Sequence, residues 1–162
     1  MEKTLLKRDS NELKTFIKHF ERGKGIKATE VTYSRFLSDK LLVAKAVKRG
    51  VPTVLFSEIK SNSPFNDIQW SAFLDINIRT LQRYRKEEGH VFKQIQSEKI
   101  FELAEVVDLG NKVFDSPEDF TIWLNTPSLA LGKNKPIDLL DTSYGKDIVM
   151  AELNRIEYGV FV

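Results

Sequence analysis

The segment Asn77-Ile-Arg-Thr-Leu-Gln-Arg-Tyr-Arg-Lys86 has the pattern of a helix with two chemically different faces. One face follows the i, i+3, i+4, i+7 spacing of a helix and carries Arg79, Gln82, Arg83 and Lys86. The other side carries residues that can pack, namely Ile78, Leu81 and Tyr84. Arg and Gln hydrogen-bond to purine edges in the DNA major groove, and Lys pairs with phosphate. The segment therefore indicates a helix that reads DNA.

The residues before this segment complete a twenty-residue helix-turn-helix template that runs from Asp67 to Lys86. Trp70 and Leu74 lie one helical turn apart on the first helix and are predicted to face the core, against Leu81 and Tyr84 of the second. Ser71 is small, as required where two helices cross closely. The first helix then braces the second, which can project into the major groove.

The predicted turn between the two helices departs from the template at one position. Asp75 stands where glycine is usual, because the backbone there is left-handed, and Asp is a tolerated substitute. Ile76 is predicted to be the buried turn residue. Asn77 is predicted to cap the second helix by accepting a hydrogen bond from the backbone N–H of Arg79 or Thr80.

These positions give a set of candidate DNA contacts. The candidates for reading bases are Arg79, Gln82 and Arg83. The candidates for contact with the phosphate backbone are Arg85, Lys86 and Lys93, with Asn77 and Thr80 at the helix N-terminus, where phosphate also binds well. The alternative is an ordinary surface helix that happens to carry several arginines.

Composition is typical of a globular protein rather than a disordered one. Of 162 residues, 41% are hydrophobic and 30% charged. There is no cysteine, which excludes disulfides, thiolate metal sites and thiol nucleophiles. No apolar run approaches a membrane span, and the first residues lack the apolar core of a signal peptide. We therefore expect a cytoplasmic protein.

Charge is distributed unevenly along the chain. Residues 1–60 carry 14 Lys and Arg against 7 Asp and Glu, whereas residues 101–162 carry 5 against 11. A basic front and an acidic back suggest surfaces for different partners, although charge also drifts along chains without function.

Helical periodicity extends through most of the chain and predicts a mostly α fold. Helices are expected near residues 10–20, 38–49, 52–60, 97–114, 117–124, 136–140 and 146–158, in addition to the helix-turn-helix. The stretch up to Phe36 leaves a short strand open as an alternative.

The sequence offers little for catalysis or for a cofactor. His19 and His90 are the only histidines, and neither has a partner at metal-ligand spacing. Gly23-Lys24-Gly25 lacks the rest of a phosphate-binding loop. We predict no enzyme activity, no metal and no cofactor.

The last forty residues carry a more specific pattern. They contain Trp123-Leu124, Ala130-Leu131-Gly132, Pro136-Ile137-Asp138-Leu139-Leu140, Tyr144-Gly145 and Leu153-Asn154-Arg155-Ile156-Glu157-Tyr158-Gly159. This order closely resembles the toxin-binding domain of the Xre/MbcA/ParS antitoxins, and the stretch Arg79 to Arg83 resembles their helix-turn-helix.

The resemblance implies a type II antitoxin. Its partners would be operator DNA and a RES-domain toxin that acts on NAD, whose active site the C-terminal domain covers. The antitoxin would form a homodimer that represses its operon, and it would form a hetero-oligomer with the toxin. The implied organisation is an N-terminal helical region (1–62), a helix-turn-helix domain (63–114) and a toxin-binding domain (115–162). The candidate toxin contacts are Lys133, Lys135, Tyr144, Lys146, Arg155 and Tyr158. A stand-alone regulator with a C-terminal interaction or dimerisation domain remains the alternative.

Overall fold

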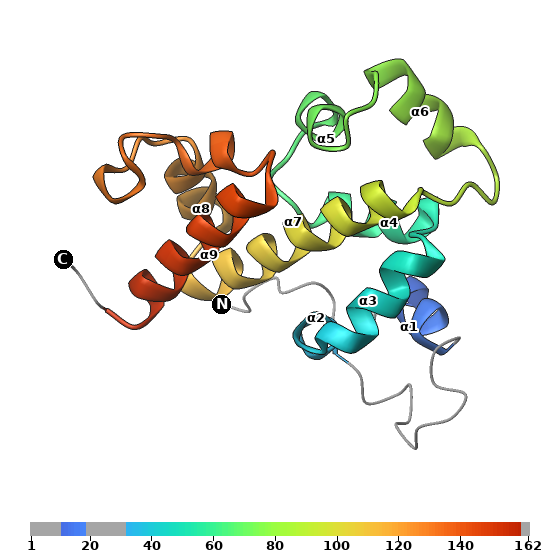
Figure 1. Ribbon diagram of the computed structural model, residues 1–162, viewed down its shortest axis with the longest axis horizontal. Coiled ribbons are helices and arrows are strands. Elements are labelled where there is room, and N and C mark those ends of the chain that lie inside the picture. Colours follow the sequence, from blue (N-terminus) through green and yellow to red (C-terminus); the bar gives the residue numbers. More distant parts are fainter. Residues whose placement is uncertain (1–10, 19–31, 160–162) are drawn as a thin grey trace. The chain divides into compact units, whose positions relative to one another are not determined.

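The computed structural model describes residues 11–18 and 32–159 of the chain (Figure 1). Within these ranges every regular element is an α-helix or a 3-10 helix, so the predicted mostly α fold class is confirmed. The chain divides into two compact units, residues 4–101 and residues 102–162. Helix α7 (Gln94–Val113) begins in the first unit and ends in the second.

The N-terminal unit is built from short helices that precede α7. They are α1 (Asn11–Lys18), α2 (Tyr33–Ser38), α3 (Lys40–Arg49), α4 (Thr53–Ser61), α5 (Asp67–Phe73) and α6 (Ile78–Lys86). An aromatic cluster forms much of the core. The Phe56 ring lies edge-on to Trp70 at 5.1 Å and contacts Phe92 at 4.9 Å, and all three side chains are fully buried. Edge-to-face contacts of this kind add to the stabilisation from burial alone.

Helices α5 and α6 form the predicted helix-turn-helix. Asp75 has φ of +51°, which confirms the left-handed turn position. The Asn77 side chain accepts from the Arg79 N–H at 2.8 Å, as expected for the cap. Trp70, Leu74 and Leu81 are buried. Ile76, predicted to be the buried turn residue, is only half-buried, and its N–H donates to the Ser71 carbonyl at 3.0 Å.

The loop after α6 is tied to the segment before α4 by hydrogen bonds. The Phe92 N–H donates to the Val51 carbonyl at 2.9 Å, and the Thr53 N–H donates to the His90 carbonyl at 3.0 Å. The fully buried Ser97 hydroxyl accepts from the Val51 N–H and donates to the Phe92 carbonyl. These bonds fix the chain immediately after the candidate recognition helix.

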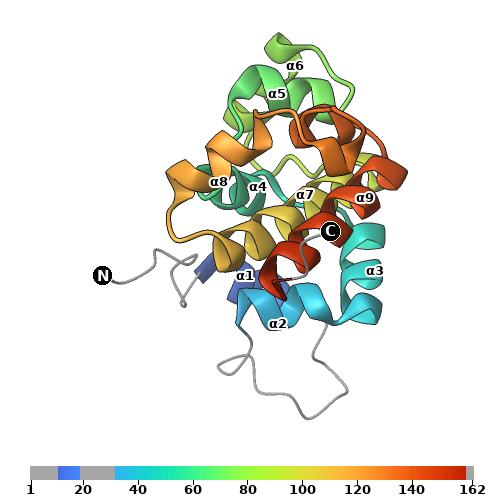
Figure 2. The same ribbon diagram turned by 90° about the vertical axis from the view of Figure 1, so that its left-hand side faces the viewer.

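The C-terminal unit contains the second half of α7 and the elements after it (Figure 2). These are α8 (Pro117–Leu124), the 3-10 turns η2 (Leu129–Leu131) and η3 (Pro136–Leu139), and α9 (Ser143–Glu157). Ser116 caps α8 by accepting from the Asp119 N–H, with Pro117 in the first turn. The α9 side chains Val149 and Leu153 are fully buried, whereas Trp123, Leu139 and Ile156 are half-buried.

Two predictions of local structure are wrong or incomplete. Residues 33–38 form helix α2, capped by Thr32 and followed at once by α3, so the alternative of a strand fails for Tyr33 to Phe36, and the part of that stretch before Thr32 lies outside the described residues. Helix α9 begins three residues before the predicted start because Thr142 caps it by accepting from the Gly145 N–H. Gly145 therefore lies inside the first turn of α9. The region around Gly23 also lies outside the described residues.

Gly145 is present because two backbones meet there. A Cβ at this position would lie 1.8 Å from the Leu139 carbonyl oxygen, which belongs to η3. Real contacts of this kind are never so short, and neither backbone can rotate away as a flexible side chain could. The glycine thus permits η3 to pack against the start of α9.

We expect Gly145→Ala to destabilise the protein by about 1–3 kcal/mol, the usual cost of overpacking a filled site. Urea unfolding followed by circular dichroism measures this change. Ala151→Ser adds one atom on the exposed side of the same helix and should change stability by less than about 0.5 kcal/mol. Equal stability of the two variants would contradict the close approach.

Candidate nucleic-acid and partner-binding surfaces

Helix α6 presents the polar face that its sequence predicts. The side chains of Arg79, Gln82, Arg83 and Lys86 are all exposed, and the opposite side of the helix buries Leu81 completely. The Arg83 guanidinium lies 5.4 Å from the centre of the Tyr84 ring, a cation–π contact that limits its motion. A rigid helix with cations and an amide on one face has the chemistry needed to read base edges and hold phosphates.

The N-terminus of α6 is less open to a ligand. The Asn77 side chain already accepts from the Arg79 N–H, and Thr80 is half-buried. Any phosphate there would be bound by backbone N–H groups of the first turn beside these side chains. Asn77 and Thr80 thus help to position the helix, and they lie beside any ligand that binds at its N-terminus.

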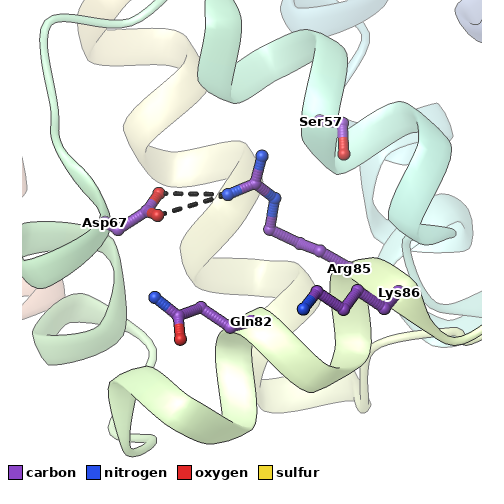
Figure 3. Close-up of a pocket in the computed structure, with 5 residues that line it drawn as sticks. All are labelled: Ser57, Asp67, Gln82, Arg85 and Lys86. Carbon is purple, nitrogen blue, oxygen red and sulfur yellow. Dashed lines mark hydrogen bonds and ion pairs between the residues drawn. The ribbon is translucent and has the colours of Figure 1, made fainter.

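The C-terminal half of α6 is held by packing and by charge. The Tyr84 ring stacks on His90 with 3.7 Å between ring centres, and the Thr53 hydroxyl lies 3.3 Å from the Tyr84 carbonyl. Arg85, a candidate for phosphate contact, points toward α5, where its Nη1 lies 3.3 and 3.2 Å from the two Asp67 carboxylate oxygens (Figure 3). Arg85 is thus the member of the predicted set whose guanidinium pairs with a carboxylate.

Asp67 lies at the edge of a hollow of about 480 Å³ lined by Ser57, Asp67, Gln82, Arg85 and Lys86 (Figure 3). Lys60 of α4 approaches the same carboxylate at 2.7 Å. The hydrogen bond from Lys60 and the charges of Lys60 and Arg85 lower the pKa of Asp67 below its usual value of 3.8, against a smaller opposing effect of burial. The carboxylate is therefore ionised at neutral pH and joins three helices.

In the C-terminal unit the predicted contact residues fall into two groups. Lys133, Lys135, Tyr144 and Tyr158 are exposed. The Lys146 ammonium instead forms a largely buried ion pair with Glu105 of α7 at 2.5 Å, and Arg155 pairs with Glu152 one turn earlier. Lys146 consequently ties α9 to α7, whatever else it contacts.

The sequence predicted Tyr144 as a contact residue but not the exposed aliphatic side chains Leu129 and Ile148 of the same unit. Leu129 of η2 is 83% exposed and Tyr144 is 87% exposed, and Ile148 lies one turn after Tyr144 on α9, half of its surface exposed. Helix α9 packs against η2. Ile148 and Val149 are adjacent apolar residues on one helix, and only one of them can face inward. This pattern indicates that the other side chain is exposed. Exposed apolar side chains grouped on one unit are typical of a protein–protein contact surface.

The described residues also bear on the sequence predictions about metal ligands, membrane spans and the two histidines. Within residues 11–18 and 32–159, no three His, Cys, Asp or Glu side chains come together as a metal site. None of the helices in this part of the chain has the length and apolar character needed to cross a membrane. His90 packs between Tyr84 and Phe92, and His19 lies outside the described residues.

Two known domain families match successive parts of the chain. Residues 43–105 match the antitoxin Xre-like helix-turn-helix domain, and residues 109–159 match the antitoxin Xre/MbcA/ParS C-terminal toxin-binding domain. A helix-turn-helix domain followed by a toxin-binding domain defines the antitoxin class of protein. The chain belongs to the Xre/MbcA/ParS antitoxin family.

Individual relatives agree with this assignment. A Prs ADP-ribosylating antitoxin from Sphingobium sp. is 48% identical over 48 residues, a match that spans only 30% of each protein. An antitoxin Xre from Photorhabdus laumondii is 28% identical over 115 residues, 70% of this chain and 77% of that one. A chain from the crystal structure of the M. tuberculosis MbcT-MbcA toxin-antitoxin complex has the same fold, with a TM-score of 0.53 at 19% identity, over 68% of this chain and 96% of that chain.

The lowered pKa of Asp67 makes its contribution to stability dependent on pH. Because the folded pKa lies below the unfolded value, the contribution is full above about pH 4 and is lost as pH falls through the folded pKa. We expect Asp67→Asn to cost about 1 kcal/mol at pH 7, as for a partly exposed ion network, and less at pH 3. Urea unfolding at both values tests this, with the exposed Glu98→Gln as control; a cost independent of pH would contradict it.

Proposed function

We propose that this protein is the antitoxin of a type II toxin–antitoxin pair and that its C-terminal unit binds a RES-domain toxin and covers the toxin's NAD-directed active site. The observation that carries the proposal is the exposure of the apolar side chains Leu129, Tyr144 and Ile148 on the unit that matches a toxin-binding domain. The pair would act in the cytoplasm, where NAD and the operon are both present.

The chemistry of this surface favours a protein partner. A tyrosine that is almost fully exposed covers a large area with few rotatable bonds, and aromatic residues are frequent anchors of interfaces. Burial of such a side chain contributes about 1.5–3 kcal/mol. Lys133 and Lys135 lie in the turn directly after η2 and add polar groups at the edge of the surface. Tyr158 supplies a second exposed ring after α9.

The helix-turn-helix supports a second activity of the same protein, repression of its own operon. We propose that a homodimer places two copies of α6 in successive major grooves, about 34–36 Å apart. Arg79, Gln82 and Arg83 would contact bases, and Lys86, Asn77 and Thr80 would contact the backbone. The support is the exposed, amide-bearing cationic face opposite a fully buried Leu81.

The toxin proposal predicts that Tyr144→Ala and Ile148→Ala weaken neutralisation. Co-expression with the product of the neighbouring gene should restore growth and cellular NAD with the parent protein, and each variant should raise the dissociation constant of the complex about 10-fold or more. Ile95→Ala removes an exposed isoleucine from the N-terminal unit and should leave both readouts unchanged. Absence of complex and rescue with the parent would favour a stand-alone regulator.

The DNA proposal predicts that Arg79→Ala and Arg83→Ala each weaken binding to a duplex that the parent protein selects from a random pool. Each lost base contact should cost roughly 1–3 kcal/mol, read as band shifts at fixed salt. The exposed Lys45→Ala of α3 removes one positive charge elsewhere in the same unit and serves as control. An unchanged shift for both arginine variants, or no selected duplex, would remove α6 as a reading helix.

A further inference from the structure

Asp67 connects three helices of the N-terminal unit. The residue is the first of α5, and its carboxylate receives Lys60 from α4 at 2.7 Å and Arg85 from α6 at 3.2 Å. The sequence separation of Asp67 and Arg85 is 18 residues, so the pair joins the start of the helix-turn-helix to its end. The turn and the buried Leu81 fix the N-terminal half of α6, and this ion pair helps to fix its C-terminal half.

The ion pair also keeps the charged group of Arg85 directed toward Asp67 rather than toward a ligand of the surface. Arg85 lies one residue before the exposed Lys86, and both line the hollow beside Gln82 (Figure 3). The Arg85 side chain keeps 37% of its surface exposed, so it is near solvent but aimed at a carboxylate. Lys60 is more enclosed and closer to Asp67, which makes Arg85 the partner that is easier to release.

We propose that Asp67 is a specificity-determining residue of the DNA-binding surface: its carboxylate keeps Arg85 away from phosphates and holds the C-terminal half of α6 in position. The inference rests on the proposed DNA binding and revises one member of the predicted contact set. Arg85 becomes a positioning residue, whereas Arg79, Gln82, Arg83 and Lys86 remain the groups that face DNA.

Loss of this carboxylate has opposite effects on the two kinds of DNA binding. A released Arg85 gains a phosphate on any sequence, which strengthens non-specific binding and increases its dependence on salt. The same loss loosens the end of the reading helix, which misplaces base contacts and weakens binding to the selected sequence. A residue that only stabilised the fold would weaken both kinds of binding together.

The test compares the parent with Asp67→Asn, Arg85→Gln and the double variant. Each binds the duplex selected by the parent and a scrambled duplex of equal length, across a series of salt concentrations. We expect Asp67→Asn to lower the ratio of selected to scrambled affinity about 10-fold, the effect of one misplaced base contact. On the scrambled duplex its salt slope should steepen by about 0.9, the value for one phosphate.

The other variants separate the two partners of the ion pair. Arg85→Gln should leave the salt slope at the parent value, because Arg85 does not reach phosphate while Asp67 holds it. The double variant should return the slope of Asp67→Asn to the parent value. Glu98→Gln removes the same charge from an exposed position of α7 and controls for net charge.

Three results would overturn the inference. One is a shallower slope for Arg85→Gln, which would make Arg85 itself a phosphate contact. The second is an equal change for Asp67→Asn and Glu98→Gln, and the third is a parallel loss on both duplexes by Asp67→Asn with unfolding excluded by circular dichroism. If the parent selects no duplex, the proposed DNA binding fails instead, a distinct outcome.

Discussion

The arrangement of the N-terminal unit depends on how little of helix α6 can be buried. Four of its nine residues are Arg or Lys, and Leu81 is its one fully buried side chain. A single leucine supplies about 2 kcal/mol of burial and cannot by itself fix the rotation of a helix. The remaining constraints are polar or aromatic: the Asn77 cap, the stack of Tyr84 on His90, and the ion pair of Arg85 with Asp67. The hydrogen bonds of the loop after α6 also help to fix this helix, because they hold the segment that contains His90 and Phe92.

The C-terminal unit is constrained in another way, by close approach of backbones and rings. Gly145 allows η3 to touch the first turn of α9, and Gly110 allows the Phe120 ring to lie where a Cβ would be 2.3 Å away. The Glu105–Lys146 ion pair then joins α7 to α9 within this unit. Such packing leaves Leu129 and Tyr144 outside the core, because the inward positions of η2 and α9 are already filled by Leu131, Val149 and Leu153. The apolar surface is therefore a consequence of a filled core rather than of a poor one.

The sequence predicted what depends on near neighbours. The Asn77 cap and the left-handed Asp75 each depend on residues within a few positions, where spacing and side-chain type are sufficient, and the burial of Trp70 and Leu81 follows from helical periodicity. The contacts that it did not predict join distant positions. Asp67 and Arg85, 18 residues apart, and Ser97 and Val51, 46 residues apart, meet only after the helices pack. Helix α2 was missed because its Tyr33-Ser-Arg-Phe-Leu-Ser38 composition favours no single state, and Thr32 and Asp39 settle it as caps at both ends.

The two surfaces differ in the forces that a ligand would meet. Exposed guanidinium and ammonium groups on α6 attract anions over a distance that salt shortens to about 8 Å at physiological ionic strength. The surface of Leu129, Tyr144 and Ile148 instead gains from removal of apolar area from water, which salt hardly weakens. A partner suited to one surface is poorly suited to the other, since an apolar protein face has nothing to offer the cations of α6 and a phosphate chain has nothing to offer Tyr144 and Ile148. Because the two surfaces differ in chemistry and lie on separate units, the two partners proposed for this chain would not compete for the same groups.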